Sequence, residues 1–513
     1  MKTETLTAET QRRRGFQMPR ADGGILEHSK RLILLALCLC VSAVQILAQE
    51  TMPTPGPAKS VNIPAVQEKK LKNGLTVAVI EKKGVPIVTS QLLVRAGASS
   101  EPSAKAGLAN LTASMLTKGT KTRTAEQIAE EMEFLGGSIG SGAGWNGSNV
   151  TMSTTPDKLD PAMAIMADVA LNPVFKQEEL DLLKSQAMDE LKYNLTQPGF
   201  LANYVASRYT FGEHPSGGTP ASLESLSRND VQSFYSQTFR PENAVLIMTG
   251  DISLATASQI AESMFGKWTP SNQKAATASV ASSGPTSDKA LVKRMLVVDL
   301  PNSGQASVNY FKPISAVGRN SDQYYTASVL NSLLGGGYSS RLNQEIRIKR
   351  GLSYGAGSSF SWRDAKTNFG ARTQTKNESA AEVAELVLAE VKKLAESNAA
   401  EAELNPRKLV LTGGFGRNLE TTGGLTGALA DLYSFGIPTN ELNKYMTSVS
   451  GVKDANVKDF AAKYLYDGDM VIVGDYAVFK ADLAKRFPNM KIDVIKVDEL
   501  NLESATLRKS DVP

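Results

Sequence analysis

The sequence predicts an α+β protein in which two halves repeat one design. From about residue 61, short runs rich in aliphatic and β-branched residues alternate with longer stretches of helical periodicity. The same order of elements returns in the second half of the 513-residue chain. Self-similarity over so long a period indicates duplication of a whole domain, and the mixture of hairpin-like strands and helices favours the α+β class.

The elements of the first half follow one another closely. Strands are predicted where apolar residues alternate or run together briefly, and helices where they recur every three or four positions. Gly136 and Gly137 mark the end of the second helix, and the small residues 140–144 lead into the next strand. These signals place strands at 76–81, 87–94 and 149–154, and helices at 106–116 and 125–135.

The second half shows the same signals. Residues 323–350 carry one long helical pattern that ends at Gly351, and a further helix is expected at 380–396. Two pairs of segments show the repeat directly. YGAG (354–357) matches IGSG (139–142) at an offset of about 215, and MVIVGD (470–475) matches LIMTGD (246–251) at an offset near 224.

Composition divides the chain into segments. The stretch 270–289 is rich in Ser, Ala, Thr and Pro, which is typical of a linker. It separates a first domain, 61–269, from a second, 290–500. The predicted flanking segments are a signal peptide at 1–48, a Pro-rich mature N-terminus at 49–60 and a tail at 501–513.

The N-terminal leader predicts export. The hydrophobic run 32–48 follows two basic residues and precedes a Pro-rich stretch, as in a secretory signal peptide cleaved after Ala48. The region before the run is long, so Met18 is an alternative start. An uncleaved membrane anchor is the competing interpretation, although 17 residues are marginal for spanning a bilayer. We therefore expect a periplasmic or otherwise extracytoplasmic protein, bound to a membrane only if the leader is retained.

Charge and cysteine content exclude several classes of function. The formal charge is +4, and residues 1–48 carry seven basic and four acidic side chains, so the remaining chain is near +1. Such a balance gives no signature for binding nucleic acid. The two cysteines, Cys38 and Cys40, lie in the leader, and each follows a leucine, which disfavours lipidation. The mature chain therefore has no disulfide and no thiol nucleophile.

Residues 107–120, GLANLTASMLTKGT, resemble a zinc-binding helix without its ligands. The pattern resembles the inverted H-x-x-E-H motif of the insulinase/pitrilysin peptidase family. Asn110 and Ser114 stand at the histidine positions and share a helix face, and Ala113 stands at the catalytic glutamate. The family's further glutamate ligand would fall near Glu190. None of the first three can hold zinc or move a proton, so we expect no metal in this chain.

Histidine content supports the same conclusion. The chain has two histidines, His28 in the leader and His214 in a predicted structural turn. Once the leader is removed, a site with two histidines cannot be built within one chain.

A second signature of the family is intact. Residues 335–354, GGGYSSRLNQEIRIKRGLSY, resemble its L-G-G-G-x-S-S-R-L…R…G-L-x-Y pattern. The resemblance implies that Arg347 and Tyr354 form a pair beside the zinc, where both donors stabilise negative charge on the scissile carbonyl oxygen. The competing interpretation is a solvated arginine and a packing tyrosine. The resemblance also implies two homologous domains, each an antiparallel sheet backed by helices, as in processing peptidases.

These observations lead to a functional hypothesis with two alternatives. Some relatives divide the zinc motif and the Arg/Tyr pair between two chains. The sequence therefore predicts a non-catalytic subunit that supplies Arg347 and Tyr354 in trans for peptide binding, with zinc held by a homologous H-x-x-E-H partner. The first alternative is an inert peptide-binding or scaffold protein of the same fold. The second is a hydrolase with an unrelated site, for which the residues offer few nucleophiles.

Overall fold

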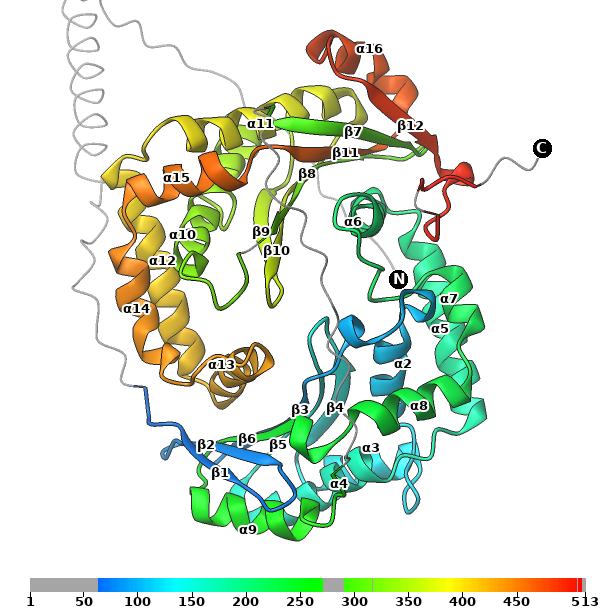
Figure 1. The fold of residues 1–513 in the computed structure, drawn as a ribbon, viewed down its shortest axis with the longest axis vertical. Coiled ribbons are helices and arrows are strands. Elements are labelled where there is room, and N and C mark those ends of the chain that lie inside the picture. Colours follow the sequence, from blue (N-terminus) through cyan, green and yellow to red (C-terminus); the bar gives the residue numbers. More distant parts are fainter. Residues whose placement is uncertain (1–62, 271–289, 316, 505, 510–513) are drawn as a thin grey trace, which may run out of the picture. The chain divides into compact units, whose positions relative to one another are not determined.

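The computed structural model describes residues 63–270, 290–315, 317–504 and 506–509 (Figure 1). The predicted signal peptide, the Pro-rich segment 49–60 and all but the first residue of the predicted linker lie outside these ranges. Both predicted domains belong to one compact unit, Val61–Pro513. The duplication is therefore best followed through the two sheets.

The first sheet has six strands in the order β1-β2-β6-β3-β5-β4. Its pairs are antiparallel except β2–β6, which is parallel. The central strand β6 reads AVLIMTG and is buried along its whole length, as a strand covered on both faces requires. The strands are β1 (Gln67–Lys70), β2 (Thr76–Glu81), β3 (Val88–Val94), β4 (Ser138–Ala143), β5 (Ser148–Thr154) and β6 (Ala244–Gly250).

The second sheet repeats this design. Its order is β12-β7-β11-β8-β10-β9, so its five strands from β7 to β9 take the places of β2 to β4 in the first sheet. Two pairs, β12–β7 and β7–β11, are parallel, and the others are antiparallel. The α+β fold of two homologous halves is confirmed. The strands are β7 (Val292–Asp299), β8 (Ala306–Ser315), β9 (Ala356–Trp362), β10 (Lys366–Thr375), β11 (Gly468–Gly474) and β12 (Ile492–Lys496).

Helices accompany both sheets, and each half has a large apolar core between its sheet and its own helices. Those of the first half are α2 (Leu108–Met115), α3 (Ala125–Phe134), α4 (Leu159–Leu171), α5 (Gln177–Asn194), α6 (Pro198–Tyr209), α7 (Pro220–Ser225), α8 (Arg228–Thr238) and α9 (Leu254–Phe265). Those of the second half are α10 (Tyr324–Leu334), α11 (Ala380–Glu396), α12 (Glu401–Leu419), α13 (Thr422–Ser434), α14 (Glu441–Gly451), α15 (Asp454–Tyr464) and α16 (Tyr476–Arg486).

One helix from each half packs on the sheet of the other half. Leu201 and Val205 of α6 are fully buried in a cluster with Phe311 of β8 and with residues of β7 and β11. In the same way, α13 contributes to a cluster with β2, β3 and β6. Leu507, from the predicted tail, is also fully buried in the cluster around α6. Because α6 and α13 each bury apolar surface against the sheet of the other half, they hold the two halves together. Burial of apolar surface stabilises the folded state by about 25 cal/mol per Å².

The single helix expected over 323–350 is wrong. The structure ends α10 at Leu334, inserts a loop of glycines and resumes with one π-helical segment, η5 (Asn343–Ile348). A Cβ on Gly335 would lie 2.2 Å from the backbone nitrogen of Ser358, so the chain comes too close to β9 there for any other residue. The apolar periodicity continues across this break because both segments bury a face in the same core.

A buried ion-pair cluster also joins the halves. Glu213, in the loop after α6, accepts hydrogen bonds from Arg363 (3.0 Å) and Asn368 (3.0 Å) and lies 3.0 Å from Lys366 Nζ. Burial alone would raise the pKa of Glu213, but the hydrogen bonds and charges of Arg363 and Lys366 outweigh burial and lower it. The carboxylate is therefore charged in the folded protein and neutralises two cations.

We expect Glu213→Gln to lower the free energy of unfolding by about 3–5 kcal/mol at neutral pH, because two partly buried cations lose their buried anion. A lowered folded pKa contributes stability above the unfolded pKa, which is lost as pH falls through the folded value. Thermal melting from pH 7 down to about pH 3 should show the advantage of the wild type shrinking below about pH 4. Glu224→Gln, at an exposed glutamate, is the control. An advantage that persists unchanged in acid would contradict this account.

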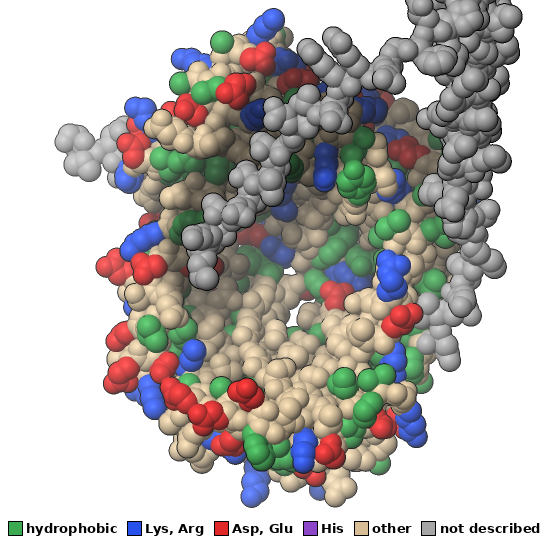
Figure 2. Space-filling view, turned by 180° about the vertical axis from the view of Figure 1, so that it is seen from behind, with side chains coloured by type: hydrophobic (Ala, Val, Ile, Leu, Met, Phe, Trp, Pro, Cys, Tyr) green, Lys and Arg blue, Asp and Glu red, His purple; other side chains and the backbone are tan. Residues whose placement is uncertain are grey.

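The surface shows no dominance of one charge. Figure 2 shows Lys and Arg side chains interspersed with Asp and Glu on the face that it presents. This mixture agrees with the near-neutral balance calculated beyond residue 48. Among the described helices, none combines the length and the apolar character needed to cross a membrane.

Candidate functional site

Helix α2 carries the motif that resembles a zinc-binding helix. Gly107 precedes it with φ +92°, a conformation that favours glycine, and a Cβ there would lie 3.1 Å from Gly218 and Leu223. All residues of the helix are buried except Asn110 and Ser114, which stand one turn apart. The two former ligand positions therefore share the one face of α2 that does not pack into the core.

Asn110 and Ser114 line a cavity of about 620 Å³ between α2, α5 and α6. Glu190 of α5 lines the same cavity, so the structure brings together the three positions that the resemblance assigned to zinc ligands. Ala113, at the catalytic glutamate position, is fully buried and does not line it. The former zinc site is thus kept as a cavity, with different chemistry on its walls.

The cavity does not suit zinc. Within the described ranges, no group of three or more His, Cys, Asp or Glu side chains is placed to hold a metal ion. The amide nitrogen of Asn110 donates to the Ser216 carbonyl (2.9 Å), and the other polar side chains of the cavity wall are mainly amides and hydroxyls. Neutral oxygens and one carboxylate do not supply the N and S ligands that zinc prefers.

His214, the one histidine of the described chain, has a structural role. Its Nε2 lies 3.0 Å from Glu101 Oε1. The buried Glu101 carboxylate in turn accepts the backbone N–H groups of Gly107 (2.9 Å) and Ala109 (2.6 Å) at the start of α2. An anion at a helix N-terminus satisfies free N–H groups and the helix dipole. The pair Glu101–His214 therefore fixes the entry of α2.

We expect Glu101→Ala to lower the free energy of unfolding by about 2–4 kcal/mol, because two buried N–H groups and the imidazole lose a charged acceptor. Denaturant unfolding followed by circular dichroism measures the loss. Glu130→Ala, at an exposed glutamate of α3, should change stability by less than about 0.5 kcal/mol. Equal stabilities of the two variants would show that Glu101 does not cap α2.

Arg347 lies in η5, and its guanidinium carbon is 5.1 Å from the centre of the Tyr338 ring. Within the part of the chain that the structure describes, its side chain forms no hydrogen bond or ion pair, and its backbone carbonyl accepts from Gly351 N–H. Its neighbour Glu345 instead binds Lys349 and Arg350. Arg347 therefore keeps its donors available at the surface, with Tyr338 beneath it.

Tyr354 stands on the loop between η5 and β9, and its side chain is 89% exposed. The loop itself is held firmly. Thr373 Oγ1 donates to the Gly355 carbonyl (3.0 Å), and the Gly355 N–H donates to Ser353 Oγ (3.0 Å). These hydrogen bonds fix the loop while the Tyr354 side chain stays in solvent, and functional residues often lie on loops positioned by a rigid scaffold.

The structure does not join the two predicted site residues directly. Among the described residues, no hydrogen bond or ring contact links Arg347 to Tyr354; Arg347 packs on Tyr338, and Tyr354 lines a cavity of about 370 Å³. Asn203 of α6 lines this cavity and also the cavity of Asn110 and Ser114. Tyr354 therefore stands one helix away from the former zinc position of its own chain.

Sequence reasoning missed three residues here: Tyr338 under Arg347, Asn203 between the cavities, and Arg372 in the wall of the Tyr354 cavity. Arg372 had a signal, because it is a single charge inside an otherwise uncharged strand segment, NFGARTQT. The other two had none, since their importance depends on which elements meet.

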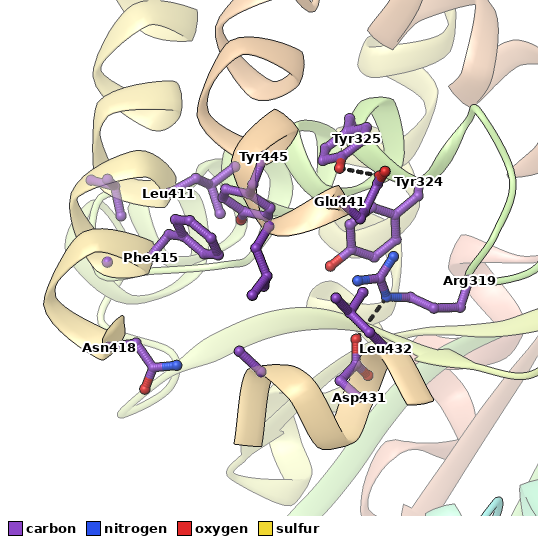
Figure 3. A pocket seen from close by; sticks show the side chains of 14 residues that line it. Arg319, Tyr324, Tyr325, Leu411, Phe415, Asn418, Asp431, Leu432, Glu441 and Tyr445 are labelled. Carbon is purple, nitrogen blue, oxygen red and sulfur yellow. Dashed lines mark hydrogen bonds and ion pairs between the residues drawn. The ribbon is translucent and has the colours of Figure 1, made fainter. Parts of the chain in front are cut away.

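A further cavity of about 400 Å³ lies between α10, α12, α13 and α14 (Figure 3). Its polar groups already have partners, since Arg319 pairs with Asp431 (2.9 Å) and Tyr325 donates to Glu441. The Phe415 and Tyr445 rings stack 4.1 Å apart, and Arg319 lies over Tyr324. Internal pairing accounts for these groups, so we do not assign this cavity the principal function.

Two homologous α+β halves, with a helix that keeps the position but not the ligands of a zinc motif, define a peptidase-like protein. The family profile "Insulinase (Peptidase family M16)" matches residues 76–209, and "Peptidase M16 inactive domain" matches 225–409. The chain belongs to the insulinase family, peptidase family M16. These matches support a peptidase-like inactive subunit.

Related proteins and structures agree with this membership. An uncharacterized zinc protease of Rickettsia bellii is 29% identical over 294 residues, which cover 56% of this chain and 68% of that protein. The peptidase M16 inactive domain from Pseudomonas fluorescens superposes with a TM-score of 0.72 at 25% identity, covering 80% of this chain and 98% of that one. A Helicobacter pylori protease shares the fold, with a TM-score of 0.75 at 20% identity, covering 80% of this chain and 100% of that one.

Proposed function

We propose that this chain is the non-catalytic subunit of a heterodimeric M16-type zinc metallopeptidase. Its partner is a homologous chain with an intact H-x-x-E-H motif, and zinc is bound there. In this proposal Arg347 and Tyr354 bind the peptide and stabilise the transition state in trans. The leader delivers the chain outside the cytoplasm.

The observation that carries the proposal is the contrast between the zinc-ligand positions on α2 and the pair Arg347 and Tyr354. Asn110 and Ser114 stand at the ligand positions and cannot bind zinc, whereas Tyr354 is 89% exposed on an ordered loop. Arg347 has no ion-pair partner within the described chain, so its charge is available to a ligand.

The chemistry assigned to this chain is electrostatic. In peptide hydrolysis negative charge develops on the scissile carbonyl oxygen, and the partner's zinc supplies Lewis-acid chemistry. A guanidinium from Arg347 and a hydroxyl from Tyr354 would donate hydrogen bonds to that oxygen. Each donor of this kind is worth about 2.7–4 kcal/mol in other enzymes. The two side chains must converge on bound peptide, because they do not contact each other in the free chain.

A second candidate is an inert peptide-binding or scaffold protein of the same fold. It is favoured by the lack of a contact between Arg347 and Tyr354, since the described partner of the Arg347 guanidinium is the Tyr338 ring. It predicts peptide binding or assembly that does not depend on the Arg/Tyr pair. The two candidates therefore differ in whether a catalytic homologue is among the partners.

Association and metal content test the proposal. The full chain should co-elute with an H-x-x-E-H homologue from the same genome as a one-to-one complex on size-exclusion chromatography. Metal analysis should find about one zinc per complex and none in this chain alone. A chain that assembles only with itself, or that carries stoichiometric zinc when purified alone, would overturn the proposal.

A further inference from the structure

Arg372 is a cation without a described anion. It lies on β10 and is partly buried, and within the described chain its guanidinium donates one hydrogen bond, from Nη1 to Ser359 Oγ (3.0 Å). Its Nε is buried without a partner within the described residues. Seven other arginines of the second half have a nitrogen within 3.0 Å of a carboxylate oxygen: Arg294, Arg319, Arg341, Arg350, Arg363, Arg486 and Arg508. Arg347, Arg407 and Arg417 also lack an ion-pair partner among the described residues, so Arg372 is distinguished by lining a cavity while its Nε has no partner.

The guanidinium lines the cavity of about 370 Å³ that also contains Tyr354. No aspartate or glutamate lines this cavity among the residues that the structure describes. The nearby walls come from Ser307 and Asn309 of β8, whose side chains are almost fully buried. Asn309 Oδ1 has no hydrogen-bond partner there either. The cavity thus combines one unneutralised positive charge with unsatisfied polar groups.

Helix α6 closes the other side of this cavity. A Cβ on Gly199 would lie 2.4 Å from Gln374 Nε2, the end of a flexible side chain, so α6 and β10 lie close together at this point. Apolar residues fill the rest of the interface between α6 and the second sheet. Arg372 is partly buried and lines the same cavity as Tyr354, and partial burial would strengthen its interaction with an anion bound there.

The fold itself does not require an arginine at this position. Arg372 pairs with Asn309, and Asn309 pairs with Val471 of β11. In the first sheet the corresponding pairs are Thr151 with Gln91, and Gln91 with Ile247 of β6. The same position is therefore an uncharged threonine in the other half, which has the same strand order. A structural need common to both halves cannot explain the charge.

Burial lowers the pKa of Arg372, and no described acidic neighbour counteracts the effect. Holding a guanidinium away from water without a counterion is unfavourable, and buried charges are normally paired. A carboxylate matches a guanidinium in charge and in its two-point geometry. The missing partner is best supplied by a ligand.

We propose that the cavity around Arg372 is a carboxylate-binding subsite for a peptide segment that also contacts Tyr354. Peptides offer carboxylates from two sources, an acidic side chain and a C-terminus. The identification as a peptide site rests on the proposed function, whereas the preference for an anion rests on Arg372 itself. The subsite would select acidic peptides or would fix the end of a peptide chain.

Three labelled peptides of one length and otherwise equal sequence test the subsite by fluorescence anisotropy with the full chain. The first has an internal glutamate and an amidated C-terminus, the second replaces this glutamate with glutamine, and the third is the second with a free C-terminal carboxylate. We expect the first or the third to bind about 10- to 100-fold more tightly than the second. The peptide that binds more tightly than the second one identifies the source of the carboxylate, either a side chain or a C-terminus.

Variants assign the gain to Arg372. In Arg372→Met, the peptide with the carboxylate should bind about as tightly as the second peptide, so that the affinity ratio falls to about one. Arg417→Gln, which removes an exposed arginine elsewhere, should keep the wild-type affinity ratio. Without peptide, Arg372→Met should melt at the same or a higher temperature than wild type, because an unpaired charge has been removed. A clear drop in melting temperature would instead indicate a structural role for Arg372.

Equal affinity for all three peptides in wild type, no measurable binding of any of them, or a preference that survives Arg372→Met would overturn the subsite. The wild-type comparison decides even if the variant does not fold. Failure of the carboxylate subsite can be distinguished from failure of the proposed peptidase function. Tyr354-dependent activation of a partner without carboxylate preference removes only the subsite, and carboxylate preference without activation removes only the heterodimeric peptidase.

Discussion

Tyr354→Phe is expected to reduce turnover by the complex with an H-x-x-E-H homologue by about 100-fold, and Arg347→Ala by about 100- to 1,000-fold. Both changes remove a donor to the scissile carbonyl oxygen, where charge is greatest in the transition state. Tyr354→Phe should leave KM nearly unchanged and lower kcat, because the hydroxyl acts mainly in the transition state. Steady-state hydrolysis of a quenched fluorescent peptide gives both constants.

Matched controls separate this role from general damage. Tyr193→Phe changes another exposed tyrosine, and Arg417→Ala another exposed arginine; both complexes should keep wild-type turnover. Because Tyr354 is exposed and Arg347 has no described ion pair, the site variants should also keep wild-type melting temperatures. Unchanged turnover in both site variants would remove the Arg/Tyr element from the account.

The second large effect is a gain of metal binding. Asn110→His combined with Ser114→His should turn a chain without zinc into one that binds about one zinc ion. The two positions stand one helical turn apart, and Glu190 lines the same cavity as a third ligand. Adding Glu190→Gln to this double variant should weaken zinc by at least about tenfold. Metal analysis after dialysis and titration against a chelating dye measure both results.

Single Asn110→His is the control, because one histidine and one carboxylate do not complete a zinc site. Zinc binding without peptidase activity is the expected outcome, because Ala113 stands at the position of the catalytic glutamate and cannot move a proton. Absence of zinc from the double histidine variant would show that the cavity has lost the geometry of the ancestral site, not only its ligands.

Local patterns predicted several elements accurately. The strand expected at 76–81 and the helix expected at 380–396 coincide with β2 and α11, because each has a clear apolar period and a clear end. The helix expected over 323–350 failed, because periodicity does not reveal that Gly335 must lie against β9. Nor can an amphipathic pattern tell which sheet a helix covers, so the exchange of α6 and α13 between the halves was not foreseeable.

The candidate site, too, could be predicted from the sequence only in part. The resemblance placed Asn110, Ser114 and Glu190 together, and the structure brings them to one cavity. The pairing of Arg347 with Tyr354 stays a prediction, because the free chain keeps them apart. Arg372 became a candidate only when the cavity showed that its charge has no described partner. Missing partners are visible in three dimensions and not in a linear pattern.

The central claim is that this chain contributes to hydrolysis without performing it alone. Its most direct test is peptide turnover by the mixed chains compared with the sum of the two chains measured separately at the same concentrations. We expect the isolated chain to show none, and the mixture to exceed the sum by at least about 100-fold through the donors from Arg347 and Tyr354. A mixture that only equals the sum, or chelator-resistant hydrolysis by the isolated chain, would contradict the account.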